Sequence, residues 1–518
     1  MLADQPTSPL YDVEPVNSKK RREQLYEPRK KIFPKRANGR FRKFKWLVML
    51  ITLAIYYITP WIRWDRGPFA PDQAVLVDLA NRRFYFFFIE IWPQEFYYVA
   101  GLLVMAGIGL FLVTSTVGRA WCGYACPQTV WVDLFLVVER AIEGERNNRI
   151  KLDAAPWSFD KLWKRVSKHT IWLLIGVGTG GAWIFYFADA PSLLQSVATL
   201  QAPAVAYITI AILTATTYTF GGLMREQVCT YMCPWPRIQG AMLDEHSLTV
   251  TYNDWRGEPR SRHAKKAIAE NKSVGDCVDC NACVVVCPMG IDIRDGQQLE
   301  CITCALCIDA CDDVMTRLGK EQGLISYATL KDYNANMALA MGTGQVVQPA
   351  RIRDKLSGKL VDAIKLTDWR SIVRPRTVVY FIGWTAIGLA MVTALALRSP
   401  LSINVLHDRN PQYVQMRDGS ISNGYDIKIL NMTPEPRTVM LRIEGLEGAT
   451  LTAGDQTASA TAIELQLAPD KVMSLRAFVQ VPAEFLPTSQ TRFIVGVAST
   501  DGAVRSETET TFDVPEHK

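Results

Sequence analysis

Residues 277–288, CVDCNACVVVCP, decide the fold of the central part of this chain, because their four cysteines follow the spacing Cys-x2-Cys-x2-Cys-x3-Cys-Pro. The spacing returns at residues 301–311, CITCALCIDAC, where Asp312 stands in place of the closing proline. Runs of this kind hold cubane [4Fe-4S] clusters: three thiolates of one run grip one cluster, and the fourth reaches across to the other. The sequence therefore predicts a ferredoxin-like domain with two clusters, one bound by Cys277, Cys280, Cys283 and Cys311, and one bound by Cys301, Cys304, Cys307 and Cys287.

Other uses of these cysteines fit less well. Paired Cys-x2-Cys steps also suit tetrahedral zinc, but zinc does not require a third cysteine at the same step twice over. The chain has 12 cysteines and none after Cys311, which is not the pattern of a secreted disulfide scaffold. Its 5 histidines all lie outside the charge-free apolar runs, which argues against a haem held by two imidazoles inside a membrane.

The rest of the chain is dominated by long apolar stretches. Each is close to the roughly 20 residues that a helix needs to cross a bilayer, so we expect five transmembrane helices. The charge-free apolar runs cover residues 46–62, 96–117, 170–188, 197–223 and 377–397.

Lysine and arginine are unevenly distributed among the connections, and this predicts the orientation. Residues 139–168 carry eight of them, whereas residues 189–196 carry none, so we place the first stretch in the cytoplasm and the second outside. Residues 1–45 have a net charge of +8 and adjoin the first apolar run, which favours a membrane-orienting tail over a nucleic-acid patch. The first residues lack a short apolar run with a cleavage site, so no removable signal peptide is expected.

These observations predict a multi-domain α-helical membrane protein. A basic cytoplasmic tail (1–45) precedes transmembrane helices 1–4 (46–223), a cytoplasmic ferredoxin domain and linker (224–376), transmembrane helix 5 (377–397) and a periplasmic domain (400–518). Residues 128–138 are apolar but too short to span and interrupted by Asp133, so we expect a helix along the inner interface. The aromatic run 84–89 suggests an interfacial or re-entrant piece in the outer loop.

Beyond Pro400 the pattern changes to short alternating segments separated by Asp-Gly, Asn-Gly and proline turns. Alternation with period two is typical of half-buried strands. About seven strands in about 119 residues predict an immunoglobulin-like β-sandwich without the cysteine pair of antibody domains. The clearest segments are 425–429, 439–443 and 463–467.

A second cysteine motif occurs twice, each time where an apolar run ends at the inner face. It reads Cys122-Gly-Tyr-Ala-Cys126-Pro127 and Cys229-Thr-Tyr-Met-Cys233-Pro234. A spacing of four places two sulfurs on one helical face, and the proline ends the helix and can begin the next one. Four soft thiolates at one depth suit Cu(I), a third iron–sulfur centre or an exchangeable dithiol, and the alternative is plain buried cysteine.

Residues 176–181 satisfy the Gly-x-Gly-x-x-Gly pattern of dinucleotide-binding loops, but they lie inside the third apolar run with no strand before them. We instead expect Gly176 and Gly180 to permit close contact between membrane helices.

This combination of two ferredoxin runs, two Cys-x3-Cys-Pro units and a C-terminal sandwich resembles the FixG/RdxA/CcoG family over nearly the whole chain. The resemblance implies an inner-membrane assembly factor for cbb-type cytochrome c oxidase that reduces Cu(II) to Cu(I) before copper delivery. It also implies that Cys122, Cys126, Cys229 and Cys233 are the membrane cysteines of the family and that the eight cysteines from Cys277 to Cys311 are its cluster ligands.

The chemistry favours the same hypothesis, an oxidoreductase acting as a cupric reductase, because clusters store single electrons and thiolates hold copper. The expected partners are cbb-type oxidase subunits, copper-handling proteins, the lipid bilayer and an electron donor that the sequence does not identify, but no nucleic acid. The alternatives are a quinol-linked membrane ferredoxin of the NapH/NosR type, and a copper carrier or scaffold that leaves the oxidation state of the metal unchanged.

Overall fold

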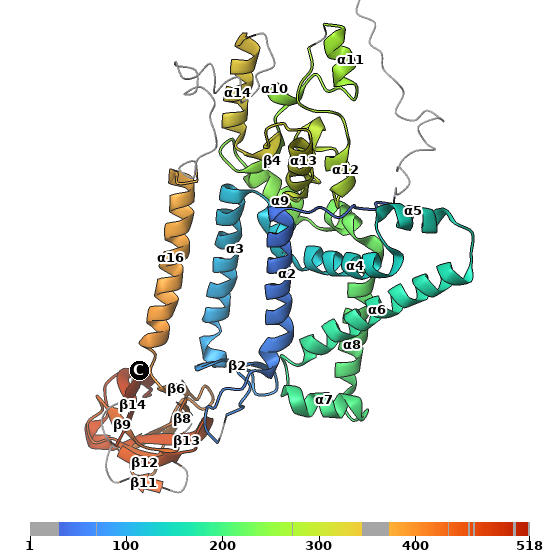
Figure 1. Cartoon of the computed structure of the whole chain (residues 1–518). Coiled ribbons are helices and arrows are strands. Elements are labelled where there is room, and N and C mark those ends of the chain that lie inside the picture. The colour runs from blue at the N-terminus through green and yellow to red at the C-terminus, as the bar shows by residue number, and fades with distance from the viewer. Residues whose placement is uncertain are drawn as a thin grey trace, which may run out of the picture.

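The protein is elongated, with a cysteine-rich lobe at one end, a β-sandwich at the other and a helical region between them (Figure 1). The computed structural model describes residues 31–515 apart from 69, 272, 344–371, 434, 454–455, 459–461 and 501–503. The predicted basic tail is therefore described only from residue 31, and most of the predicted linker before the last apolar helix lies outside the described residues.

The helical region contains long apolar helices that run lengthwise between the two ends (Figure 1). Within the described residues, four helical stretches are long and apolar enough to cross a membrane: Arg40–Trp61, Pro93–Val117, Ala204–Met224 and Pro375–Ala396. The helices of this region are α2 (Arg40–Ile58), α3 (Tyr97–Val117), α4 (Pro127–Glu143), α5 (Arg146–Ala154), α6 (Phe159–Ile184), α7 (Ala190–Ala198), α8 (Ala204–Thr217) and α16 (Pro375–Ala396).

Four of the five predicted apolar runs correspond to these four stretches. The remaining run, residues 170–188, falls largely within α6, which is not among these four stretches. The reason is that α6 ends at Ile184, so its charge-free part after Lys168 and His169 is too short to supply an apolar stretch of 18 residues. The run predicted at 197–223 begins later, at Ala204, because residues 190–198 form the separate helix α7 and Pro203 precedes α8.

Helices α6 and α8 pack against each other through small residues. A Cβ added at Gly180 would lie 2.9 Å from the Ile210 carbonyl oxygen, and one added at Gly176 would lie 3.2 Å from Thr214. Side chains at these two positions would force the helices apart, which confirms the predicted close contact.

Helix α4 lies across the direction of α2 near the cysteine-rich end, as expected for residues 128–138 (Figure 1). Pro127 is its first residue, because a proline at this position has no N–H to leave unpaired. Asp133, the charge that interrupts the apolar run, is buried and accepts two hydrogen bonds from Arg42, at 2.8 and 3.0 Å.

The loop between α2 and α3 forms a small antiparallel sheet rather than a re-entrant segment. Its strands are β1 (Val75–Asp78), β2 (Arg83–Phe86) and β3 (Ile89–Ile91), in that order. The aromatic run 84–89 thus supplies strand β2 and the turn to β3, because alternate side chains such as buried Tyr85 pack inward. Arg83 pairs with Glu90 and with Asp470 of the sandwich, so the sheet contacts the C-terminal domain.

The cysteine-rich lobe is built from short helices around a two-stranded sheet. Its elements are α9 (Trp235–Met242), β4 (Thr249–Tyr252), α10 (Asp254–Gly257), α11 (Ala264–Ala269), α12 (Ala282–Val286), η6 (Ile293–Asp295), α13 (Leu306–Arg317), β5 (Ile325–Ala328) and α14 (Leu330–Thr343). The backbone N–H groups of Phe41 and Arg42, at the start of α2, donate to the Asp309 carboxylate on α13 at 3.2 and 2.7 Å. Since a carboxylate satisfies the unpaired donors of a helix N-terminus, this contact attaches the lobe to the first membrane helix.

The C-terminal domain is a two-sheet sandwich. One sheet has the order β11-β10-β13-β8-β6 with β7 beside β8, and the other has the order β12-β9-β14-β15. The strands are β6 (Leu401–His407), β7 (Val414–Gln415), β8 (Ile421–Asn431), β9 (Arg437–Glu444), β10 (Thr450–Ala453), β11 (Gln456–Ala458), β12 (Ala462–Leu467), β13 (Lys471–Val481), β14 (Thr491–Ser499) and β15 (Arg505–Phe512).

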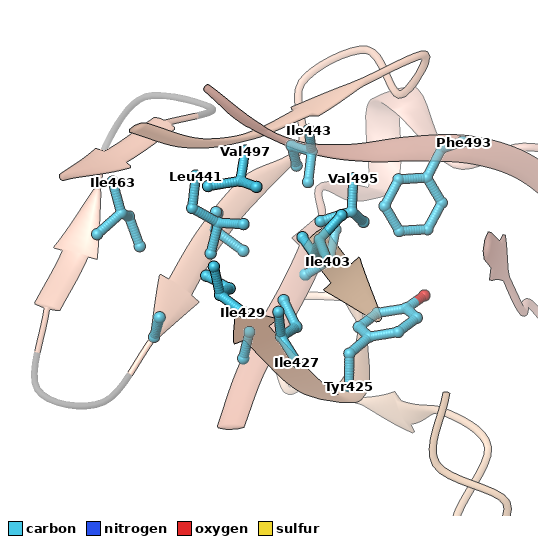
Figure 2. Close-up of a cluster of buried hydrophobic side chains, with 14 of the residues drawn as sticks. Ile403, Tyr425, Ile427, Ile429, Leu441, Ile443, Ile463, Phe493, Val495 and Val497 are labelled. Carbon is cyan, nitrogen blue, oxygen red and sulfur yellow. The ribbon is translucent and has the colours of Figure 1, made fainter. Parts of the chain in front are cut away.

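Alternate side chains of both sheets meet in an apolar core (Figure 2). Ile427 and Ile429 of β8 face Leu441 and Ile443 of β9 across it, all of them buried. The three segments predicted as strands lie in β8, β9 and β12, which confirms them, although the described part of the domain has more strands than the seven expected.

Candidate functional site

The two ferredoxin runs adopt the same local backbone. Each Cys-x2-Cys-x2-Cys loop leads directly into a helix, α12 in the first run and α13 in the second. The residues on both sides of Cys280 and Cys304 have φ between 49° and 59° although none is glycine: Asp279, Asn281, Thr303 and Ala305. Such left-handed residues curl a loop tightly, so that successive thiols point to the same interior space.

The loops enclose two cavities, each lined by a different set of thiols. The first is lined by Cys277, Cys280, Cys283 and Cys311, with apolar Val314, Met315 and Leu324 behind them. The second is lined by Cys287, Cys301, Cys304 and Cys307, with Cys283 at its border. The structure thus groups the eight cysteines as the alternating spacing pairs them, and Cys283 lies between the two groups.

Several thiols that line these cavities have raised pKa values, because burial disfavours their ionised form. Burial, and then repulsion from neighbouring thiolates, raises the pKa of Cys287 to about 12 and that of Cys311 to about 12. Burial also raises the pKa of Cys301 to about 11. A metal core that takes up the negative charge of the thiolates removes this penalty, so the donor set and its enclosed apolar space fit iron–sulfur clusters.

The first cavity also contains a fixed positive charge. The guanidinium of Arg294 lines it and is held by Asp279 at 2.7 Å, by Asp292 at 2.6 Å and by the Asn281 side chain at 2.7 Å. Its charge is felt by Cys283, where it opposes the effect of burial on the thiol pKa. Arg294 was not singled out by sequence analysis, because no motif marks it.

The two Cys-x3-Cys-Pro units are structurally equivalent. In each, an apolar helical stretch ends at a residue with positive φ, and a short π-helical turn follows. Gly118 (63°) comes directly after α3, whereas Arg225 (47°) comes after Tyr218–Met224, the π-helical continuation of α8. The turns are Trp121–Ala125 and Val228–Met232, and the second cysteine of each unit follows its turn directly, before the proline. Both apolar stretches therefore end in the same way, the first leading into α4 and the second into α9.

This repetition brings the four membrane cysteines together. The charges of Cys126 and Cys233 both act on Cys122, and those of Cys126, Cys122 and Cys233 act on Cys229. Burial, and then these neighbours, raises the pKa of Cys229 to about 12. Among the described residues, no group of three or more His, Cys, Asp or Glu side chains is arranged to hold a single metal ion.

Two polar side chains that sequence analysis did not identify contact Cys122. Its thiol donates to the buried Gln239 side chain of α9 at 2.9 Å. The positive charge of Arg119, whose side chain is also buried, lowers the pKa of Cys122 against the effect of burial. The charge of Arg119 also reaches Cys301, so one guanidinium lies near both a ferredoxin thiol and a membrane thiol. Proximity to Cys122 in the motif could have indicated Arg119, but nothing in the sequence pointed to Gln239.

The membrane thiols lie directly against the second ferredoxin loop. The Tyr124 hydroxyl, between Cys122 and Cys126, donates to the Cys304 carbonyl at 3.1 Å. A Cβ at Gly123 would lie 2.6 Å from the Ile302 carbonyl oxygen and 3.0 Å from the Cys304 Cα. Cys122 packs on the apolar cluster that contains Cys304, so the second cavity, and not the first, adjoins the membrane thiols.

Comparison with known proteins places these features in context. Residues 224–330, which contain ten of the cysteines, match a family described as a 4Fe-4S dicluster domain. Residues 99–143, whose only cysteines are Cys122 and Cys126, match a family described as a 4Fe-4S binding domain. Residues 391–515 match the family described as the IG-like fold at the C-terminal of FixG.

Three bacterial relatives cover most of the chain. The nitrogen fixation protein FixG of Rhizobium meliloti is 69% identical over 91% of this chain and 90% of its own length. Protein RdxA of Cereibacter sphaeroides is 52% identical over 82% of this chain and 85% of its own length. Protein RdxB of the same organism is 55% identical over 81% of this chain and 83% of its own length. The crystal structure of a FixG-related protein from Vibrio parahaemolyticus is 20% identical and covers 22% of this chain and 97% of its own, with a TM-score of 0.20.

Proposed function

Since this chain belongs to the FixG/RdxA family of membrane-associated iron–sulfur electron-transfer proteins, we propose that it reduces Cu(II) to Cu(I) for the assembly of cbb-type cytochrome c oxidase. The observation that carries the proposal is the contact of Cys122 and its neighbour Tyr124 with the loop of Cys304. A store of single electrons thereby adjoins a set of soft ligands, which is what a change in the oxidation state of copper requires.

In this proposal the protein spans the bacterial inner membrane five times, with α6 as the crossing of lowest hydropathy. The N-terminus and the cysteine-rich lobe are cytoplasmic, and the sandwich is periplasmic. The opposite placement of lobe and sandwich (Figure 1) supports this topology, as does the cluster of buried cations around α4 and the start of α6, including Arg149 and Lys168. The partners are oxidase subunits and copper-handling proteins on the outer side and an electron donor on the inner side.

Two [4Fe-4S] clusters, which accept and release electrons singly, would occupy the two cavities. Cys277, Cys280, Cys283 and Cys311 would hold the one farther from the membrane, and Cys287, Cys301, Cys304 and Cys307 the nearer one. The apolar walls of both cavities exclude water, while Cys280 is exposed and gives a donor access to the far one. Cys283, which lines both cavities, shortens the path between them.

Copper is the substrate in this scheme, bound by Cys122, Cys126, Cys229 and Cys233. A cluster held by Cys287, Cys301, Cys304 and Cys307 would supply the one electron that converts Cu(II) to Cu(I), and the thiols that become copper ligands would release their protons. Arg119 offsets the negative charge of the thiolates from one side, and the Gln239 side chain orients the Cys122 sulfur. Because Cu(I) prefers soft sulfur ligands, the reduced ion is the form that this set stabilises.

The test is a single turnover without an external reductant. The protein is purified anaerobically, reduced with dithionite, desalted and mixed with Cu(II) and a chromogenic Cu(I) chelator. We expect about eight iron per chain, because each of the two clusters has four, and about two Cu(I) per chain, because each cluster gives up one electron. The double variant Cys122→Ala with Cys229→Ala should lose most of the rate, whereas Tyr231→Phe, an exposed residue of the same turn, should not.

Other outcomes would replace the proposal. Equal rates in the double variant and the wild type would remove the membrane thiols from the mechanism. Reduction of the clusters by a quinol analogue without any copper reduction would identify a quinol-linked carrier, and copper bound with unchanged oxidation state would identify a copper carrier. About twelve iron per chain would assign the membrane thiols to a third cluster, as the match of residues 99–143 suggests.

A further inference from the structure

A third cavity lies between the membrane thiols and the cysteine-rich lobe. Its lining includes Cys229 from the membrane side and Pro288, Met289 and Ile302 from the lobe. Met289 also lines the cavity of Cys287, Cys301, Cys304 and Cys307, so one thioether residue belongs to the walls of both spaces. No motif in the sequence marked this methionine.

The position of Met289 is set by its place in the chain. It follows Cys287 and Pro288 directly in the chain, so it lies beside the thiols of the second cavity and forms part of the wall of that cavity. Its side chain packs against the same apolar cluster as Cys122. Met289 therefore has membrane thiols on one side and a ferredoxin thiol on the other.

The surroundings argue against a purely space-filling role. A methionine that only fills a gap is enclosed by apolar side chains. The cavity that Met289 shares with Cys229 also has polar and charged residues among its apolar ones, including Lys45, Gln128, Asp133 and Glu226. A polarizable sulfur that faces such a space next to a thiol has the chemistry of a ligand for a soft cation.

We propose that Met289 is a thioether ligand of copper, binding Cu(I) together with Cys229 at the wall shared by the two cavities. The inference rests on the proposed function, in which Cu(I) is the product formed at the membrane thiols. A neutral thioether selects Cu(I) without adding to the negative charge of four thiolates, so it favours retention of the product beside the lobe that supplies the electron.

The test uses the full-length protein in detergent, grown with selenomethionine and loaded anaerobically with one equivalent of Cu(I). X-ray absorption at the copper edge should show copper–selenium scattering in the otherwise wild-type protein and none in Met289→Leu. Competition with a Cu(I) chelator should show an affinity about ten-fold lower in Met289→Leu, the low end of the effect of altered metal surroundings. Leucine keeps the volume of methionine, so this exchange disturbs packing little.

Met242→Leu serves as the matched control, because Met242 is a buried methionine of α9 with no part in any of the three cavities. It should retain both the selenium signal and the affinity. Absence of copper–selenium scattering in the protein with all methionines intact would overturn the inference, even if Met289→Leu fails to fold. Failure of that protein to bind Cu(I) at all would instead overturn the proposed function, so the two are distinguishable.

Discussion

Substitution of Gly123 by alanine should separate the ferredoxin lobe from the membrane thiols without removing a single sulfur. The added Cβ would stand 2.6 Å from the Ile302 carbonyl oxygen and 3.1 Å from the Cys304 backbone nitrogen. Both are backbone atoms that cannot rotate away, so the loop must withdraw until ordinary contact, roughly 3.4 Å or more, is restored. Overpacking of this kind costs about 1–3 kcal/mol, and misplacement of reacting groups by about 1 Å can slow a reaction about a hundred-fold.

The assay is the single-turnover copper reduction described above, with iron content and the EPR signals of the reduced clusters measured on the same sample. We expect Gly123→Ala to keep its iron and its reduction by dithionite but to reduce copper at least about ten-fold more slowly. Gly178→Ala is the matched control, because a Cβ at Gly178 meets nothing within 4 Å. A rate in Gly123→Ala equal to that of the control would refute the claim that this contact sets the distance for electron transfer.

Three further predictions concern charge and exposure. The charges of Lys45 and Arg42 outweigh burial and hold the pKa of Asp133 below its usual value. The stability that the ionised carboxylate contributes is therefore complete above about pH 4 and is lost only below that. In fluorescence-monitored unfolding, Asp133→Asn should lower the unfolding free energy by about 3 kcal/mol, equally at pH 5.5 and pH 8. In the iron-free protein, brief treatment with maleimide at pH 7.5 followed by peptide mass spectrometry should find Cys280 labelled well before Cys287. The reason is that Cys280 is exposed, whereas burial raises the pKa of the Cys287 thiol to about 12. Equal labelling of the two cysteines would contradict the burial of Cys287. Burial, and then Asp470, raises the pKa of Glu90 to about 7, so the stability from its protonated form is lost as the pH rises through 7. Hydrogen-exchange protection at the contact with the sandwich, corrected for the intrinsic exchange rate at each pH, should fall from pH 5.5 to pH 8 in the wild type. A fall of the same size in Glu90→Gln would argue against this carboxyl.

Much of the architecture could be predicted because it depends on patterns that are local in the sequence. Strand alternation after Pro400 places Leu441 and Ile443 in the core of the sandwich, and the spacing of cysteines after Cys277 predicts loops that gather thiols. Helix ends were less predictable. Residues 170–188 read as an independent crossing, but they continue a helix that starts at Phe159, since the preceding lysines and arginines are good helix formers as well as charges.

The amino-acid order alone therefore determined which thiols exist, how they are spaced, and where the chain is apolar enough to enter a bilayer. Only the tertiary structure decided which of these groups meet. Cys122 and Cys229 are far apart along the chain, and they come together because two apolar helical stretches are each followed by an equivalent π-helical turn. Gln239 and Met289 join them through contacts between distant segments, which no local pattern encodes, since packing of the assembled chain and not periodicity fixes such contacts.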